Sequence, residues 1–99
     1  MAFQIVWSLN AVNDFKEIAD YLIKNWGEKV ALEFEYKLYA KVELLAHQPL
    51  TGRTSVSFNN IKSILITKHN RLYYLINYST LEILNILDTR QDPAKNIYE

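Results

Sequence analysis

Hydrophobic residues follow two different periods along the chain, and the first period is that of a strand. Phe3, Ile5 and Trp7 occupy alternate positions close to the start. Side chains of a strand point to opposite faces in turn, so this alternation predicts a short first strand.

The next two segments have the spacing of amphipathic helices. Ser8 or Asn10 can cap the first helix, and Gly27 can end it, because a left-handed cap is easiest at glycine. The second helix cannot continue beyond Pro49. The apolar series are Ala11, Phe15, Ile18, Leu22 and Trp26, and then Ala31, Phe34, Leu38, Val42 and Leu45. The short link at Gly27 makes the two helices an antiparallel hairpin.

The period changes again after Pro49, to that of strands. Residues 50–60 are expected to form a loop with a short strand near Val56 and Phe58. Three β-type runs follow at 61–67, 71–78 and 81–87, joined by the short turns KHN and YST. The order β-α-α-β-β-β predicts an α+β fold, with the helical hairpin packed on a small, mostly antiparallel sheet in one domain, 1–99.

Both faces of the predicted sheet carry large side chains. Leu72, Tyr74, Ile76 and Tyr78 share one alternation, and Tyr73 and Leu75 share the other. Two helices can bury only one face. We therefore expect either that the sheet curls over its second face or that an apolar groove is left for a partner.

The charge balance is neutral overall but uneven along the chain. There are 11 basic and 11 acidic residues in 99, yet no acidic residue lies between Glu43 and Glu82, and all three arginines (Arg53, Arg71 and Arg90) lie after His47. A locally positive surface can therefore coexist with zero net charge. The carboxylates Asp14, Glu17 and Asp20 are read as a solvated helix face.

Composition excludes several classes of site. The chain has no cysteine, and His47 and His69 stand 22 residues apart, so neither a metal site nor a cofactor is predicted. No glycine-rich phosphate loop and no serine nucleophile motif occurs. No apolar run is long enough to span a membrane, and the start lacks the features of a signal peptide, so the cytoplasm is the expected location.

Basic residues of the three strand segments are the main candidates for chemistry. Lys62, Lys68, Arg71 and Arg90 can gather at one end or face of the sheet once the strands become neighbours. Alternatively they are scattered surface charges. His69 is either a solvated turn residue or a general acid or base beside Arg71.

An ordered set of phrases carries a family likeness. LLAHQPLTGR (44–53), IKSILI, NRLYYLINY and ILNILDTRQDP, in the order β-α-α-β-β-β, together resemble toxins of the RelE/ParE superfamily of bacterial type II toxin-antitoxin systems. The resemblance covers nearly the whole chain. It implies a growth-inhibiting toxin, associated with plasmid stabilisation, whose partner is a cognate antitoxin.

The RNA-cutting branch of that superfamily would assign catalytic roles. By resemblance, Lys62, Arg71, Arg90 and Tyr98 would then be the catalytic residues of a metal-independent endoribonuclease that acts on mRNA at the ribosome. The second basic position of the pattern is Ile64, however. Cleaving RNA without a metal needs several converging basic groups, and this neutral chain offers few of them.

The DTRQDP ending resembles the ParE-like branch more closely. That branch is associated with poisoning of DNA gyrase and is not a nuclease, and a third alternative is an inactive fold that only holds its antitoxin. Asp88 or Asp92 is expected to hold Arg90 at the sheet's edge, or to meet a partner's charge. The expected binding residues are Arg53, Lys68, His69, Arg71, Tyr73 and Arg90. The antitoxin segment would fold on binding over the apolar strands and basic groove, in a toxin-antitoxin hetero-oligomer.

Overall fold

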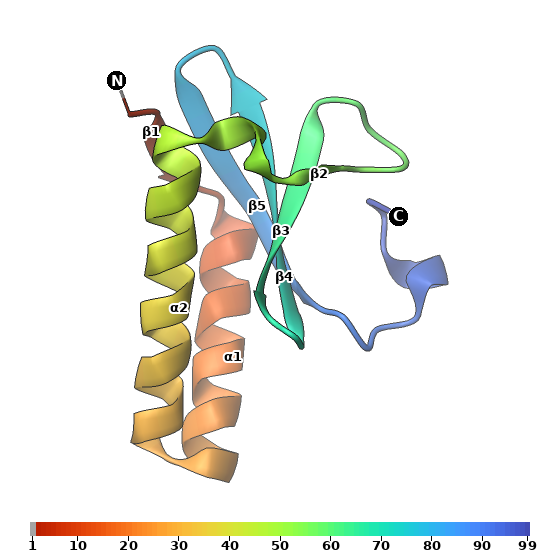
Figure 1. The fold of residues 1–99 in the computed structure, drawn as a ribbon. Helices are drawn as coiled ribbons and strands as arrows, with labels where there is room; N and C mark the ends of the chain where they lie inside the picture. Colours follow the sequence, from red (N-terminus) through yellow and green to blue (C-terminus); the bar gives the residue numbers. More distant parts are fainter. Residues whose placement is uncertain (1) are drawn as a thin grey trace.

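A computed structural model describes residues 2–99 as two helices packed on a five-stranded sheet (Figure 1). The α+β class and the order β-α-α-β-β-β are confirmed, with one further short strand. The elements are β1 (Gln4–Trp7), α1 (Leu9–Trp26), α2 (Glu28–His47), η1 (Pro49–Thr51), β2 (Arg53–Thr54), β3 (Ile61–Thr67), β4 (Asn70–Asn77), β5 (Thr80–Asp88) and η2 (Pro93–Lys95). Over the described residues, no helix is both long and apolar enough to cross a membrane.

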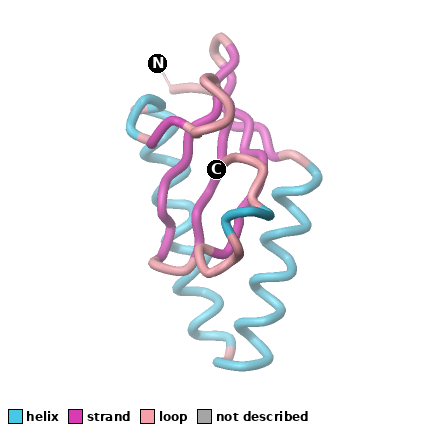
Figure 2. The backbone as a smooth tube through the Cα atoms, turned by 90° about the vertical axis from the view of Figure 1, so that its right-hand side faces the viewer, coloured by secondary structure: helices cyan, strands magenta, loops and turns pink. Residues whose placement is uncertain are grey.

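The sheet is mixed, in the order β1-β5-β4-β3-β2. β5 pairs with β1 in parallel, and all other neighbours are antiparallel. The first and last strands of the chain therefore lie side by side, and β4 and β5 occupy interior positions. The helical hairpin covers one face of this sheet (Figures 1 and 2).

The start of α1 is fixed by Ser8 and not by Asn10. The Ser8 hydroxyl oxygen accepts the Ala11 backbone N–H at 3.0 Å, which is the N-cap interaction, and the hydroxyl donates to the Leu84 carbonyl at 2.8 Å. One side chain thus caps the helix and ties it to β5. Gly27 does end α1 with a positive φ of 95°, but its ψ of 167° is extended, so the left-handed helical cap predicted there was wrong.

The core lies between the hairpin and the sheet. Leu38, Leu45, Leu72 and Leu81 are fully buried there. A bulge in β5 shapes this face, because Tyr73 is opposite Asn85 while Tyr74 is opposite Ile83, which leaves Leu84 as an extra residue. The extra residue allows both Ile83 and Ile86 to face the helices, although they are three positions apart.

The short strand after α2 is at Arg53–Thr54, and the strand predicted near Val56 and Phe58 was wrong: Val56 is 82% exposed and lies in the loop that follows. Tyr74 explains the actual position. Its buried hydroxyl donates to the Pro49 carbonyl at 2.6 Å and accepts the Gly52 N–H at 3.0 Å, which fixes the backbone immediately before β2.

The second face of the sheet is covered by the end of the chain. We call residues 93–99 the tail; Figure 2 shows it lying across the strands, on the side away from the helices. Tyr98 is only 5% exposed and Tyr73, beneath it, only 2%. Of the two expectations for this face, neither a curled sheet nor an open apolar groove describes it. Tyr78, expected in the strand, lies instead in the β4–β5 turn and is 95% exposed.

Loss of the Tyr74 hydroxyl is expected to destabilise the fold. In Tyr74→Phe, the Pro49 carbonyl and the Gly52 N–H lose their partner in a buried place, which should lower the free energy of unfolding by about 1–3 kcal/mol. Urea unfolding measures this. The matched control is Tyr39→Phe, at a 52% exposed position on α2, which should change stability by less than about 0.5 kcal/mol. Equal effects of the two variants would contradict the role assigned to Tyr74.

Candidate functional site

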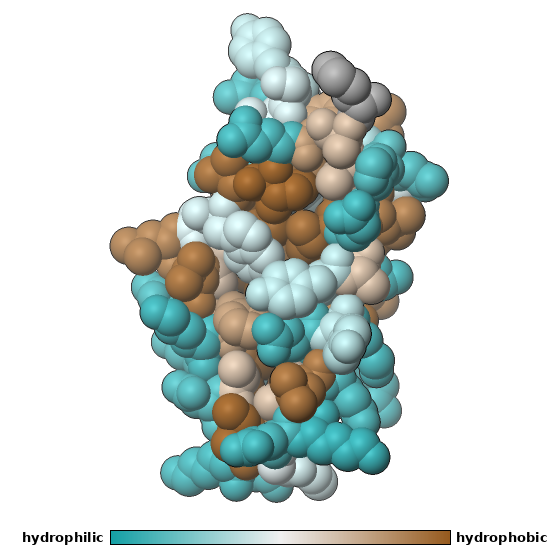
Figure 3. All heavy atoms as spheres, turned by 90° about the vertical axis from the view of Figure 1, so that its left-hand side faces the viewer, coloured by the Kyte–Doolittle hydropathy of each residue, from teal (hydrophilic) through white to brown (hydrophobic). Residues whose placement is uncertain are grey.

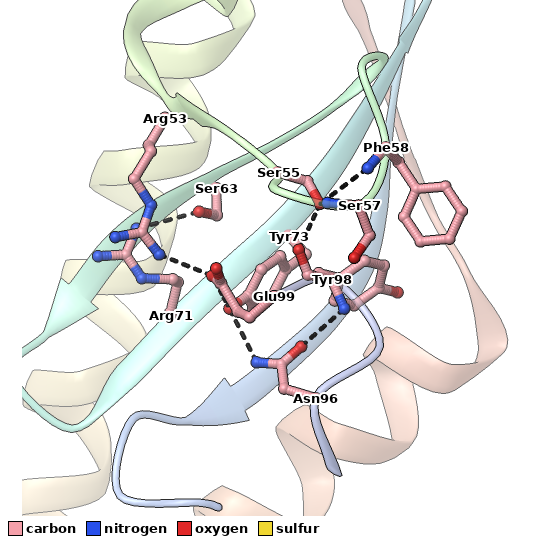
Figure 4. Close-up of polar contacts among 10 residues, drawn as sticks. All are labelled: Arg53, Ser55, Ser57, Phe58, Ser63, Arg71, Tyr73, Asn96, Tyr98 and Glu99. Atoms are coloured by element: carbon pink, nitrogen blue, oxygen red, sulfur yellow. Dashed lines mark hydrogen bonds and ion pairs between the residues drawn. The ribbon is translucent and has the colours of Figure 1, made fainter. Parts of the chain in front are cut away.

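Two tyrosine rings form the centre of the site on the second face of the sheet (Figure 4). Tyr73 projects from β4, and the Tyr98 ring stacks on it with 4.4 Å between ring centroids and 19° between planes. Phe58 packs edge-on against Tyr98 at 6.4 Å. The Tyr98 hydroxyl donates to the Asn85 side-chain oxygen at 2.5 Å, so this ring is held on both its face and its tip.

The carboxylate of Glu99 lies beside the ring pair. It accepts from the Arg53 guanidinium at 2.6 Å and from the Tyr73 hydroxyl at 3.0 Å. Asn96 completes the arrangement: its amide donates to the Tyr73 oxygen at 3.0 Å, and its side-chain oxygen accepts the Tyr98 N–H at 2.9 Å. Ser55, which is buried, donates to the Tyr98 carbonyl.

Arg71 is the second cation of this site. It lies on β4 two residues before Tyr73, so both point to the same face, and its guanidinium donates to the Ser63 hydroxyl at 3.0 Å. Partial burial and the nearby positive charge of Arg53 lower the pKa of Arg71. Among the described residues Arg71 forms no salt bridge, whereas Arg53 has Glu99.

A groove of about 460 Å³, most of whose lining residues are polar or charged, lies next to the tail. It contains four of the six residues expected to bind a partner, namely Arg53, Lys68, Arg71 and Tyr73. Leu65, Leu87, Asp88, Thr89, Gln91, Asn96 and Glu99 complete its lining. The structure therefore brings together a cationic cluster that the sequence distributes over β2, the β3–β4 turn and β4.

Lys62 lies on the other face of the sheet from Arg71. It is opposite Tyr74 in the β3–β4 pairing, and Tyr74 faces the helices, whereas Ser63 is opposite Tyr73. The Lys62 ammonium donates to the Thr54 hydroxyl at 2.9 Å, at the edge of the sheet. Of the four residues given catalytic roles by the RNA-cutting resemblance, Lys62 is thus separated from Arg71 by the sheet itself.

Arg90 is bound to Asp88 at the end of β5. Its guanidinium donates to both carboxylate oxygens, at 3.0 and 2.7 Å, and its backbone N–H donates to the same carboxylate at 2.8 Å. This bidentate pair lowers the pKa of Asp88 and raises that of Arg90. Asp92 instead accepts the Ala94 N–H, so it is Asp88 that holds Arg90.

Arg90 and His69 line a different, larger groove of about 720 Å³, which we call the hairpin groove. It lies between α1 and the ends of β4 and β5, with Ile18, Leu22 and Trp26 forming its apolar side. The hairpin extends beyond the sheet (Figure 1), so Trp26 is 67% exposed there. On the helix side of the molecule, apolar side chains form separate groups among polar ones (Figure 3).

Several residues of the site were missing from the sequence-based prediction. Asn96, Glu99, Ser55 and Ser63 are ordinary polar residues in the sequence, and only the folded tail brings them together. Asp14 also differs from its expectation as a solvated residue. Its carboxylate accepts the Asn85 amide and the Ile86 N–H, both at 2.9 Å, and so links α1 to the edge of β5.

The described residues contain no group of three or more His, Asp or Glu side chains arranged to hold a metal ion. What the site does contain is a buried pair of stacked tyrosine rings, two arginines, the Glu99 carboxylate and several neutral hydrogen-bonding groups. Such a set can bind a planar ring together with anionic groups.

Comparison with known proteins identifies similar sequences and folds. Residues 5–93 match the family model described as the ParE toxin of the type II toxin-antitoxin system parDE. No curated protein matches the sequence. Among solved structures, a chromosomal ParDE TA system from P. aeruginosa is similar with a TM-score of 0.76 and 19% identity, covering 88% of this chain and 96% of that one. The YoeB/ParE toxin from Agrobacterium tumefaciens gives 0.63 and 16%, covering 86% and 96%. At these identities, the structural likeness shows the fold alone.

Alkaline pH is expected to weaken the fold through the stacked tyrosines. Burial raises the pKa values of Tyr73 and Tyr98 above the ordinary value for tyrosine. The hydrogen bond that the Tyr73 hydroxyl donates to Glu99 raises the pKa of Tyr73 further, and the negative charge of Asp14 raises that of Tyr98 further. The folded state therefore keeps protons that the unfolded chain releases. This stabilisation is complete below the unfolded pKa of about 10 and is lost as pH rises through the folded values.

The measurement is urea unfolding at a series of pH values on both sides of pH 10. Tyr73→Phe should show a shallower decline than the unaltered chain, because it removes one of the groups concerned. Tyr78→Phe, at a 95% exposed position, is the control and should follow the unaltered chain. Identical curves for Tyr73→Phe and the unaltered chain would contradict the assignment.

Proposed function

We propose, from the premise that this chain belongs to the ParE toxin family of type II toxin-antitoxin systems, that it inhibits growth by poisoning DNA gyrase. The predicted membership of the RelE/ParE superfamily, nearer its ParE-like branch, is confirmed by the family match. The family implies an antitoxin partner. Gyrase as the target, and neutralisation by a cognate antitoxin in a cytoplasmic hetero-oligomer, belong to the proposal.

The separation of the basic residues supports a toxin that is not a nuclease. Metal-free cleavage of RNA needs groups that activate the 2′-hydroxyl, stabilise the charged phosphorane and protonate the leaving oxygen, all around one phosphate. Here Lys62 lies on the opposite face from Arg71, and Arg90 is paired with Asp88 in another groove. The Tyr98 hydroxyl donates its hydrogen bond to the Asn85 side-chain oxygen.

Charge supports the same conclusion. A protein that grips ribosomal RNA normally neutralises many phosphates with lysines and arginines. This chain has zero net charge, and two of its three arginines are already paired with carboxylates. Binding to a protein target requires fewer positively charged side chains than binding to RNA, because a protein has no phosphate backbone to neutralise.

Expression of the chain alone in a bacterial host tests the proposal. Growth, the DNA-damage response and transcript integrity are followed together. We expect growth arrest with a damage response and intact transcripts, because gyrase poisoning leaves broken DNA and does not cut mRNA. Co-expression of the cognate antitoxin should restore growth.

Two variants sharpen this test. Arg71→Ala should leave transcripts as intact as they are with the unaltered chain, and Lys16→Ala, an exposed lysine of α1, serves as the control for expression level. Transcripts cut within codons, with cutting lost in Arg71→Ala, would overturn the proposal in favour of a ribosome-dependent endoribonuclease. Normal growth with abundant folded protein would instead indicate a fold that only binds its antitoxin.

A further inference from the structure

The tail occupies the second face of the sheet as a bound peptide would. We infer that the surface formed by Arg53, Arg71, Tyr73 and Phe58 is a binding site for an extended segment of a partner protein in which an aromatic residue is followed by acidic residues, and that the chain's own Tyr98-Glu99 occupies it in the absence of that partner. This inference concerns the binding chemistry of the surface and does not depend on gyrase as the target.

The first element of the site is a slot for an aromatic ring. The Tyr98 ring lies between the face of Tyr73, 4.4 Å away, and the edge of Phe58, 6.4 Å away. Both arrangements are favourable for aromatic pairs. Ser55 adds one hydrogen bond, to the backbone carbonyl of the residue that carries the ring, and this contact is available to any residue placed there.

The second element is an anion site that the tail fills only in part. Glu99 bonds Arg53 and the Tyr73 hydroxyl, while Arg71 donates only to the neutral Ser63 hydroxyl among the described residues. Figure 4 shows the Arg53 and Arg71 guanidinium groups next to each other, with one carboxylate beside them. A segment with two consecutive acidic residues would place a second carboxylate beside Arg71, which forms no salt bridge among the described residues.

Asn96, Tyr98 and Glu99 attach the tail through the contacts described above, whereas Ile97 is 67% exposed and Ala94 and Lys95 are also exposed. None of the backbone–backbone hydrogen bonds of residues 93–99 goes to a strand; they join neighbours such as Lys95 to Asp92 and Glu99 to Asn96. Detaching the tail therefore breaks no bond of the sheet.

The competition between tail and partner has a definite thermodynamic form. A ligand tethered to its own site acts at a high effective concentration, of the order of millimolar for a short flexible link. To displace the tail, a partner segment must bind the site more tightly than the tail does, by enough to offset the tail's effective concentration. A carboxylate placed beside Arg71 would provide this additional binding energy, because Arg71 has no salt bridge among the described residues. Removing the tail's ring should therefore strengthen binding of an external segment.

The experiment uses the full chain and a fluorescent peptide that repeats residues 96–99 and adds a second glutamate. Fluorescence anisotropy gives its dissociation constant. We expect binding to Tyr98→Ala to be at least about tenfold tighter than to the unaltered chain, because the tail no longer competes. Ile97→Ala, also in the tail but exposed, should bind like the unaltered chain. Glu99→Gln, which keeps the ring, should give an intermediate value and covers the case in which Tyr98→Ala fails to fold.

The arginines and the peptide's acidic residues are tested in the Tyr98→Ala background. Adding Arg53→Ala should weaken binding about tenfold, as expected for loss of a hydrogen bond to a charged group. Adding Arg71→Ala should remove the advantage of the second glutamate over a glutamine at that position. Lys37→Ala, which removes an exposed positive charge from α2 on the other side of the sheet, is the control and should have no effect.

Three results would overturn the inference. These are equal peptide binding by the unaltered chain and Tyr98→Ala, indifference to Arg53→Ala, and tighter binding of a single-stranded oligonucleotide than of the peptide by Tyr98→Ala. Because these assays use purified protein and no growth measurement, failure here leaves the gyrase proposal standing. Conversely, a toxin with another target can still bind the peptide as described.

Discussion

Two helices can bury only one face of a five-stranded sheet, and the structure of this protein depends on how the other face is covered. On the helix side, Leu72, Tyr74, Ile83 and Ile86 pack beneath the hairpin. On the other side, Tyr73 is just as large and would remain in contact with water. The Tyr98 ring removes it from solvent, with Asn96 and Glu99 satisfying the Tyr73 hydroxyl at the rim. The Tyr73 ring on β4 is therefore buried by residues 96–99 of the tail.

The junction between α1 and β5 connects these two layers. β1 pairs with β5 only as far as Ile83, and beyond that point the edge of β5 needs other partners. Ser8 and Asp14 supply them, through the Leu84 carbonyl and the Ile86 N–H. Asn85, between those two residues, bonds Asp14 with its amide and Tyr98 with its oxygen, so that one side chain joins the helix layer to the tail.

The distribution of charge follows from the same arrangement. Residues 44–81 include no acidic residue, so an arginine in this stretch can form a salt bridge only with a carboxylate from elsewhere in the chain. Arg53 does so with Glu99. Arg90 is paired locally with Asp88 and belongs to the hairpin groove. The molecule thus has two chemically different grooves, one cationic and aromatic and one largely apolar.

Local pattern was sufficient to predict the two helices, the order of elements and the three long strands, because helix and strand periods are written in neighbouring residues. The resemblance in those same segments was sufficient for the family. The short strand at Arg53–Thr54 was misplaced, since its position depends on a hydrogen bond from Gly52 to Tyr74, 22 residues further along. A binding role for Arg53, Arg71 and Tyr73 was predicted from the sequence and stays a prediction. Their separation from Lys62 depends on which face of the sheet each strand position takes. No local sequence pattern predicted that the tail covers Tyr73, because its contacts join residues far apart in sequence. Such contacts form only when folding brings the tail against the sheet, so only the tertiary structure determines them.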